Sequence, residues 1–312
     1  MDVLSAVFIA PFAQMWDNPE FLLEVVLGGL LSGVLYSLVA LGFVLIYKAS
    51  GVFNFAQGTM VLFAALTLAG LMDKQVPSWA AILLTIAVMV ALAFIVERAV
   101  LRPLVNQEQI ILFMATIGIT YVLRGVGQIM WGGDVRTLDL GLPTTPWLVG
   151  GVVMVNKFDL VSAAVAGTLV AVLAVFFQKT AVGRALRAVA DDHQAALAVG
   201  IPLKSIWVIV WTAAGLVALV AGTLWGTNLG VQFSIELVAL KALPVLILGG
   251  FTSIPGAIVG GLIVGAGEKI AEVYWGPALG GAIEDWFAYM LALAFLLFRP
   301  QGLFGERIIE RV

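Results

Sequence analysis

Long apolar runs, each about as long as a membrane-crossing helix, dominate the chain. Six of them contain no Asp, Glu, Lys or Arg: 25–47, 49–72, 75–96, 160–178, 205–235 and 242–267. A seventh stretch, 109–131, is interrupted only by Arg124, and a shorter run covers 286–298. A spanning helix needs about 20 apolar residues, whereas membrane-barrel strands alternate in polarity over about ten. The pattern therefore predicts an all-α, polytopic membrane protein.

Within these runs we predict nine crossings, in a fold with about 8–10 transmembrane helices. The predicted segments are 24–46, 56–72, 77–96, 109–131, 158–178, 206–226, 237–250, 256–274 and 285–298. The seventh and ninth segments are only about 14 residues long, so we expect tilted, broken or re-entrant segments there. Residues 3–16 are apolar but contain Pro11, and we expect them to lie on the membrane or partly within it.

The distribution of Lys and Arg predicts the orientation. These residues gather in the loop 179–204, in the turn after the third segment and in the C-terminal tail, which lie on one side if nine segments cross. Short cytoplasmic loops carry an excess of Lys and Arg, so we expect the N-terminus outside and the C-terminus in the cytoplasm. We divide the chain into an external segment 1–20, a transmembrane domain 21–305 and a cytoplasmic tail 306–312.

Composition narrows the function classes. Apolar residues make up 62% of the 312 residues, charged residues make up 11%, and the mean hydropathy is +1.09. Soluble domains are about 45–50% apolar and about 25% charged, so this chain is not one of them. A net charge of −3 without a basic stripe argues against nucleic acid as a partner. The chain has no cysteine, a single histidine (His193), no phosphate-binding G-x-x-x-x-G-K-[ST] motif and no G-x-S-x-G motif. We therefore expect no catalytic residues and no metal site.

Glycines recur with the spacing that lets membrane helices pack closely. Four pairs lie four residues apart: Gly29/Gly33, Gly222/Gly226, Gly256/Gly260 and Gly261/Gly265. Such a smooth face either packs against another helix of the same chain, which we favour, or forms a dimer interface.

Two polar, glycine-containing breaks interrupt the apolar pattern, at 48–58 and at 249–256. Breaks at corresponding places in two halves indicate an internal repeat and a transport path. The residues we expect to line this path are Asn54, Phe55, Gln57, Thr252 and Ser253. A tight turn, with these residues serving only in packing, is the alternative.

Few ionisable residues lie within the predicted segments. For Arg124, the alternatives are a functional role and a side chain that extends to the membrane surface. For Lys241, they are a side chain that extends to the membrane surface and an ion pair with Glu236. Glu268 and Lys269 are expected to reach the outer interface. Ion-gradient-driven carriers usually place acids or histidines in mid-span, and this chain is poor in them.

The loop 179–204 carries the most specific pattern. Its alanine-rich sequence between Arg184 and Gly200 predicts a short helix followed by a turn at Gly200 and Pro202. The spacing of Ala195, Ala196 and Gly200 resembles the E-A-A-x-x-x-G coupling segment of ABC-importer permeases, although Gln194 takes the place of the glutamate. The residues expected to face an ATPase are Arg184, Arg187, Ala190, Asp191, Asp192, Ala195, Ala196 and Gly200. An ordinary amphipathic loop helix is the alternative.

Further segments resemble one family in order and spacing. They are 51–58, 240–242 with 248–250, 254–257 and 299–304, and the resemblance covers about residues 21–305. These segments resemble the permeases of branched-chain amino acid ABC transporters, most of all the first of the two permease subunits.

The resemblance implies a subunit of an ATP-driven importer in the bacterial inner membrane. Its implied partners are a second permease, two ATPases that bind ATP and Mg, and a periplasmic solute-binding protein, while this chain itself binds no cofactor. The family also includes permeases for urea, short amides and aromatic carboxylates. The alternative function is an ion-gradient-driven secondary transporter of small solutes.

Overall fold

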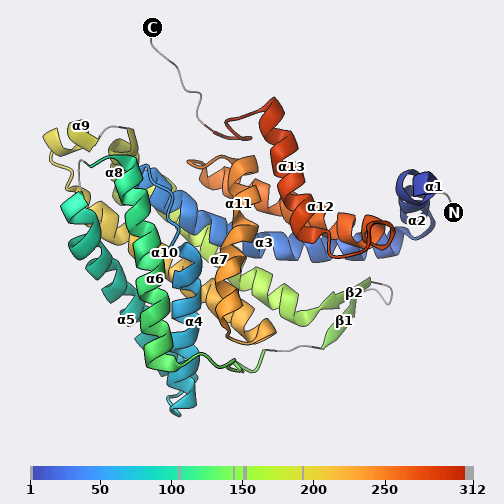
Figure 1. Cartoon of the computed structure of the whole chain (residues 1–312), viewed down its shortest axis with the longest axis horizontal. Helices are drawn as coiled ribbons and strands as arrows, with labels where there is room; N and C mark the ends of the chain where they lie inside the picture. The colour runs from blue at the N-terminus through green and yellow to red at the C-terminus, as the bar shows by residue number, and fades with distance from the viewer. Residues whose placement is uncertain (1–2, 105–106, 143–144, 150–152, 192, 306–312) are drawn as a thin grey trace, which may run out of the picture. The chain divides into compact units, whose positions relative to one another are not determined.

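A computed structural model describes residues 3–104, 107–142, 145–149, 153–191 and 193–305, and in this part of the chain the fold is helical apart from one short hairpin (Figure 1). A helix coincides with each of the nine predicted crossings: α3 (Pro19–Ser50), α4 (Gln57–Asp73), α5 (Ser78–Val96), α6 (Gln109–Trp131), α7 (Lys157–Lys179), α10 (Leu203–Leu229), α11 (Val238–Gly249), α12 (Ile254–Leu279) and α13 (Glu284–Phe298). The prediction of an all-α polytopic membrane protein is confirmed.

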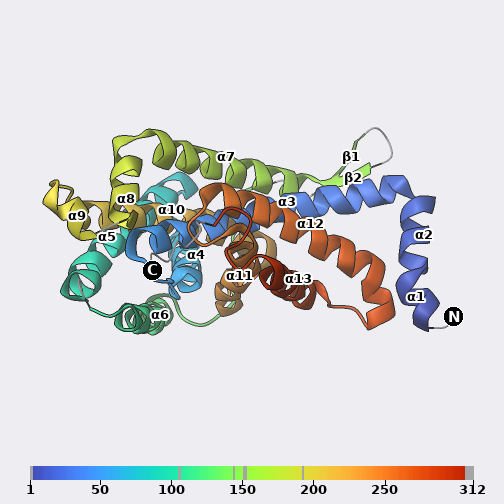
Figure 2. The ribbon, with the colours of Figure 1, turned by 90° about the horizontal axis from the view of Figure 1, so that it is seen from above.

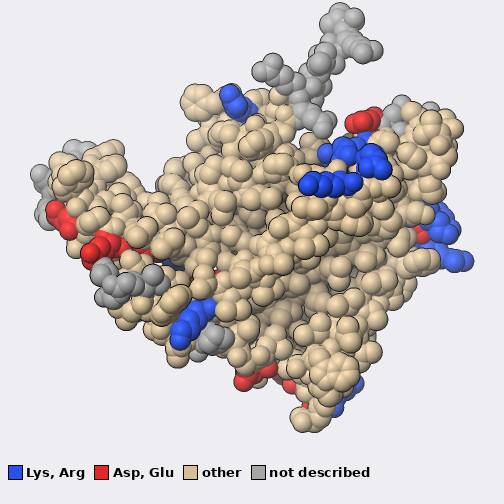
Figure 3. Space-filling view, turned by 180° about the vertical axis from the view of Figure 1, so that it is seen from behind, with Lys and Arg blue, Asp and Glu red and all other residues tan. Residues whose placement is uncertain are grey.

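The nine helices differ in length. Within the described residues, six segments are long and apolar enough to cross a membrane: α3, α5 with its continuation to Leu104, α6, α7, α10 and α12. The helices α4, α11 and α13 have 17, 12 and 15 residues. Charged side chains are unfavourable in contact with lipid, so a membrane protein has few of them on its lipid-facing surface. Figure 3 shows wide areas of surface without Lys, Arg, Asp or Glu.

Shorter elements connect these helices. They are α1 (Val3–Phe8), α2 (Ala10–Asp17), η1 (Glu97–Leu101), η2 (Arg102–Leu104), β1 (Pro146–Val149), β2 (Val153–Asn156), α8 (Ala181–Asp191), α9 (His193–Ala198) and η3 (Phe233–Leu237). The strands β1 and β2 were not expected from the sequence. They pair in antiparallel orientation, with Pro146 opposite Asn156 at one end and Val149 opposite Val153 at the other. The hairpin leads directly into α7 (Figure 2).

The chain forms two compact units. Unit 1 contains the described residues of 1–37, 141–167 and 241–312, and unit 2 contains those of 38–140 and 168–240. The helices α3 and α7 each contribute one part to each unit, and α11 begins in unit 2 and continues in unit 1.

In unit 2, α4 is the central helix. It contacts α5, α6, α10 and η3, and its residues from Gln57 to Gly70 are all buried. The helix is apolar on every side, as expected for one enclosed by other helices. Gly222 of α10 lies against the carbonyl of Val61, so the two backbones approach closely there.

In unit 1, the N-terminal part of α3 packs closely against α12 through glycines. A Cβ atom at Gly33 would lie 2.5 Å from the carbonyl oxygen of Gly261, and one at Gly265 would lie 2.5 Å from the Cα of Gly33. A Cβ atom at Gly29 would lie 2.7 Å from the Cα of Ala266. Packing within the chain, which the sequence favoured for these glycine pairs, is therefore confirmed.

The N-terminal helices α1 and α2 lie on α12. The indole Nε1 of Trp275 donates to the carbonyl of Val7 at 3.0 Å, and the rings of Phe12 and Trp275 meet edge to face at 5.6 Å. With 6 and 8 residues, neither helix is long enough to cross a bilayer. Phe8, Phe12 and Trp16 remain exposed, which suits a position at the membrane surface.

The segment before α11 runs along α4. Its first residue, Val231, pairs with Arg136, whose guanidinium contacts Asp73 at the C-terminal end of α4. Its last part, at Glu236, lies against Gly58 at the N-terminal end of α4. The seventh predicted crossing, 237–250, coincides with the short helix α11, and a non-helical stretch and η3 lie just before it.

Candidate functional site

The loop between α7 and α10 folds as two short helices, α8 and α9. Both of them contact α10, and they also contact each other. On α8 the residues Gly183, Leu186 and Val189 are buried, and this spacing of three places them on one face. Gly183 lies so close to the carbonyl of Phe177 that a side chain there would collide with it. The predicted helical character of this loop is confirmed.

The two predicted arginines of α8 differ in their surroundings. Arg184 is exposed. Arg187 is half-buried and donates from Nη1 to the carbonyl of Phe177 at 3.0 Å, so it satisfies a free carbonyl at the C-terminal end of α7. Its guanidinium therefore already has a structural role within the chain.

The helix α9 and the turn after it present an apolar edge. Ala196 is buried, whereas Leu197 and Val199 are 51% and 76% exposed. Gly200 has a φ of +84°, a left-handed conformation that favours glycine, and it ends the segment. Ala195 and Ala196 were selected from the sequence by their spacing to Gly200, and the larger side chains of Leu197 and Val199 were not.

The remaining predicted coupling residues lie along the same segment. Ala190 is half-buried, and Asp191 and Ala195 are exposed. Asp192 lies outside the described residues. That these residues contact an ATPase stays a prediction.

The first break, residues 51–56, connects α3 to α4 within unit 2. Asn54 and Gln57 are fully buried. Asn54 accepts from the amide of Ala56 through Oδ1 at 3.1 Å, which is a local turn hydrogen bond. Gln57 donates from Nε2 to the carbonyl of Ala214 at 3.3 Å, near the middle of α10. The break therefore reaches well into the helix-packed region. There Asn54 Oδ1 and Gln57 Nε2 are paired with protein, whereas Gln57 Oε1 is buried without a hydrogen-bond partner among the described residues.

Phe55 belongs to a row of aromatic rings. Phe43 stacks on Phe53 at 4.7 Å between ring centroids, and Phe53 meets Phe55 edge to face at 5.3 Å. Phe55 in turn meets Phe113 of α6 at 5.2 Å. Its amide donates to the Thr116 hydroxyl at 3.2 Å, so the break is fixed to α6 by backbone and ring contacts together.

The second break, residues 250–253, lies in unit 1 between α11 and α12. The hydroxyl of Ser253 accepts from the amide of Gly256 at 3.0 Å and caps α12. Thr252, the neighbouring path candidate, is half-buried. The tail closes over this break, because the amide of Leu303 donates to the carbonyl of Leu248 at 2.8 Å. In this arrangement Ser253 serves the helix terminus, and the path role of both residues remains a prediction.

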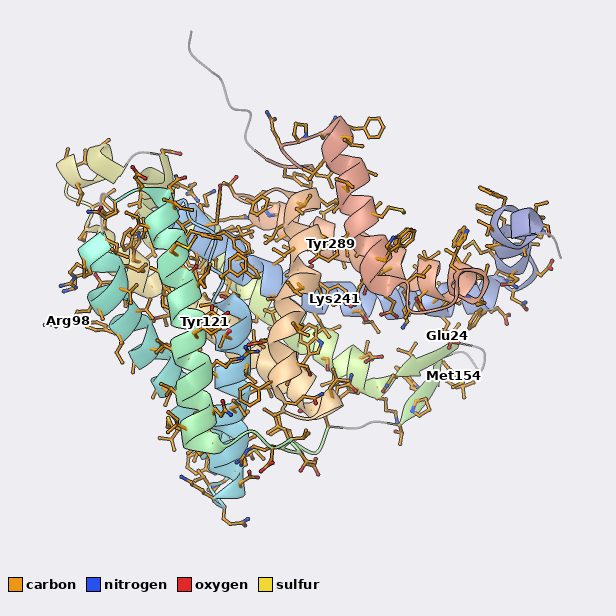
Figure 4. All side chains as sticks on the ribbon, viewed as in Figure 1. Glu24, Arg98, Tyr121, Met154, Lys241 and Tyr289 are labelled. Atoms are coloured by element: carbon orange, nitrogen blue, oxygen red, sulfur yellow. The ribbon has the colours of Figure 1, made fainter. Side chains whose placement is uncertain are left out.

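A cluster of charged residues in unit 1 was not expected from the sequence. Lys241 of α11 pairs with Asp285 of α13, and its ammonium also lies 3.6 Å from Glu268 and 3.8 Å from Glu284. The Tyr36 hydroxyl donates to Glu268 Oε1 at 2.5 Å. Figure 4 marks Lys241 on α11 and Tyr289 on α13. The cluster joins four helices of the unit.

The cluster corrects two expectations. Glu268 is only 2% exposed, so it does not extend to the outer interface but lies buried against Tyr36 and Lys241. Lys241 pairs with the acids of α12 and α13 and not with Glu236. A charged group at membrane depth is costly unless it is paired, and here the partners are distant in sequence.

Glu236 has a different partner, Arg124 of α6 in unit 2. The Thr59 hydroxyl donates to the other carboxylate oxygen of Glu236 at 3.4 Å. This ion pair holds the segment before α11 against α6, and the two alternatives for Arg124, a functional role or extension to the membrane surface, stay predictions. Within the described residues, no group of three His, Asp or Glu could hold a metal ion.

Long apolar helices and close helix packing at glycines define a polytopic membrane protein. The chain belongs to the family of permease components of branched-chain amino acid transport systems, whose model matches residues 25–299. The family consists of transport permeases and not of enzymes. The comparisons give no support to the alternative of an ion-gradient-driven carrier.

Two relatives cover nearly the whole chain. LivH of Salmonella typhimurium, a permease protein of a high-affinity branched-chain amino acid transport system, is 27% identical over 310 residues, or 94% of this chain and 98% of LivH. BraD of Pseudomonas aeruginosa, with the same description, is 30% identical over 308 residues, or 93% of this chain and 98% of BraD. The family resemblance inferred from the sequence is therefore confirmed.

One solved structure shares the fold. It is PsaBC from Streptococcus pneumoniae in complex with Fab, with a TM-score of 0.52 and 12% identity, and the match covers 94% of this chain and 98% of that chain. At this identity the likeness concerns the fold alone. The six long apolar helices of the described residues and the permease family support a multi-pass membrane protein.

Proposed function

We propose that this chain forms half of the translocation path of an ATP-driven importer for branched-chain amino acids or related small polar or carboxylate solutes. The family supports the solute class, as do LivH and BraD, which are permeases of branched-chain amino acid transport systems. ATP and Mg bind to separate subunits, and this chain couples to one of them through the segment from α8 to Gly200.

The exposed apolar edge at Leu197 and Val199 carries the coupling proposal. Two neighbouring exposed apolar side chains in a water-facing loop offer a surface that a partner protein can bury. The opposite face of the segment is fixed to the chain by Leu186, Val189 and Ala196, so a push on the exposed edge is transmitted to α7 and α10. The left-handed Gly200 directs the chain from this edge into α10.

The proposed complex contains a second permease, two ATPases and a solute-binding protein outside the membrane. In this arrangement the chain spans the inner membrane of a bacterium with its N-terminus outside and its C-terminus in the cytoplasm. The segment from α8 to Gly200 then lies on the cytoplasmic side, where positively charged residues gather in short loops.

Co-purification of the ATPase with variants of the exposed edge tests this function. We expect Leu197→Asp and Val199→Asp to reduce the ATPase recovered with the tagged chain, because a charge in the contact opposes burial. The matched control is Leu229→Asp, since Leu229 is 58% exposed at the other end of α10. Equal ATPase recovery from all three variants would contradict the proposed coupling surface.

A further inference from the structure

A cavity of about 330 Å³ lies in unit 1 where α3, β2, α7 and α12 meet. Small-molecule sites usually measure about 300–1,000 Å³, so this one suits a small ligand. Figure 4 marks Glu24 on α3 and Met154 on β2, both of which line the cavity. The amide of Met154 donates to Glu24 Oε2 at 3.2 Å, and this bond holds the hairpin beside α3.

The cavity carries both signs of charge. The carboxylates of Glu24 and Asp159 and the ammonium of Lys269 line it, and they come from α3, α7 and α12. Asp159 is in the first turn of α7, where the helix dipole favours the charged carboxylate. The described lining thus offers acceptors for a cation and a donor for an anion within one small space.

The rest of the wall is largely apolar. Phe21, Val25 and Leu31 of α3 and Val273 of α12 line the cavity. Val25 is buried, whereas Phe21 is 47% exposed. Charged and apolar groups that share one small space match a ligand with charged groups at one end and a small hydrocarbon group at the other.

The charged side chains that line the cavity still have hydrogen-bonding positions available to a ligand. Lys269 lies 3.4 Å from Glu284 Oε1, but an ammonium has three donors and its side chain is 45% exposed. Glu24 uses one oxygen for the amide of Met154, which leaves the other oxygen as an acceptor. A ligand can therefore bind without breaking the contacts that the described residues make.

We propose that this cavity binds a zwitterion with a small apolar side chain, that is, an α-amino acid such as leucine. Its ammonium group pairs with Asp159 and Glu24, its carboxylate pairs with Lys269, and its hydrocarbon group lies against the α3 wall. The ligand class deepens the proposed function and rests on it. The cavity adjoins the N-terminal ends of α3 and α7, the side from which the proposed binding protein delivers solute.

The absence of cysteine from the sequence permits a direct test by single-cysteine labelling. Val273→Cys places a thiol in the cavity, and Glu20→Cys places the control thiol one turn before Glu24 on exposed α3 surface. The full chain, with the subunits that co-purify, is labelled with a maleimide in phosphatidylglycerol nanodiscs. Ligand occupancy divides the labelling rate by about 1 + [L]/Kd, so leucine at ten times its Kd lowers the rate about tenfold at Val273→Cys. No protection is expected at Glu20→Cys.

Analogues and a second substitution test the charge assignment. Isoamylamine lacks the carboxylate and isovalerate lacks the amine, so neither should protect as leucine does. Adding Lys269→Gln to Val273→Cys should abolish protection by leucine, whereas Lys157→Gln, a lysine that donates to Thr145 and does not line the cavity, should preserve it. If Val273→Cys does not fold, Met154→Cys on β2 provides a second reporter in the cavity.

The same preparations separate the possible outcomes. Undiminished labelling at both reporters in the presence of leucine overturns the inference, even if ATP-dependent leucine uptake shows that the proposed function holds. Protection by leucine without ATP-dependent uptake supports the cavity and contradicts the proposed function. A lipid headgroup with an amine and a phosphate has similar chemistry, and protection by phosphatidylethanolamine nanodiscs without leucine would overturn the amino-acid assignment.

Discussion

Removing the charge of Lys241 should destabilise the chain through the acid that it leaves buried. The substitution Lys241→Met keeps a long side chain but leaves Glu268, which is 2% exposed, with its hydrogen bond from the Tyr36 hydroxyl and without the nearby ammonium. Breaking a buried ion pair by removing one partner costs about 3–5 kcal/mol. Because Lys241 is 23% exposed and Glu268 keeps its bond to Tyr36, we expect about 2–3 kcal/mol.

A double-mutant cycle isolates the interaction. Glu268→Gln removes the buried charge, so Lys241→Met should cost less in that background, with a coupling energy of about 1–2 kcal/mol. The free energy of unfolding of the four variants can be measured by detergent titration of the purified chain. Lys269→Met is the control, because that lysine is 45% exposed and such pairs contribute about 0–1 kcal/mol. Additive effects of the two substitutions, within about 0.5 kcal/mol, would refute the argument that the pair acts as a unit.

Three further predictions concern packing and coupling. Gly33→Val should prevent stable folding, because its Cβ would lie 2.5 Å from the carbonyl oxygen of Gly261, whereas Gly28→Ala, with no atom nearby, should leave thermal stability unchanged. Trp207→Phe removes the indole donor to the last turn of α3 and should lower the free energy of unfolding by about 1 kcal/mol in a denaturant titration. Gly200→Val strains a left-handed residue, and we expect ATP hydrolysis to continue without solute uptake while the complex still assembles. Normal uptake per ATP in that variant would contradict the role of Gly200.

The periodic and apolar parts of the fold were predictable from the sequence. The predicted crossing at 109–131 coincides with α6, and that at 285–298 differs from α13 by one residue. A segment within a membrane must satisfy its backbone hydrogen bonds internally and therefore forms a helix. The length of the apolar run then predicts where the helix begins and ends. The seventh segment was expected to be short, and α11 has only 12 residues.

The pairing of charges was not predictable in the same way. Lys241 is near Glu236 in sequence, yet its partners Glu268 and Asp285 are brought to it by the packing of α11, α12 and α13. A sequence shows the cost of a buried charge but not which distant residue compensates for it. For the same reason, the cavity between α3, α7 and α12 has no signal in any single segment.

The hairpin and the tail are further examples. Each strand of the β1–β2 hairpin has only four residues, which is too few for a polarity pattern. The tail segment 299–304 contributed to the family resemblance, but only the structure explains it, through the hydrogen bonds of Leu303 and Phe304 to the end of α11. A motif can thus be conspicuous in a sequence while its physical purpose depends on a partner elsewhere in the chain.

Solute uptake by reconstituted liposomes tests the central claim most directly. The tagged chain, with the subunits that co-purify in mild detergent, is reconstituted with the solute-binding protein outside, and uptake of leucine is followed with ATP and Mg enclosed or omitted. We predict accumulation only when ATP is enclosed, and co-purification of an ATPase and a second permease. Uptake by the chain alone, driven by a proton or sodium gradient without ATP, would contradict the account.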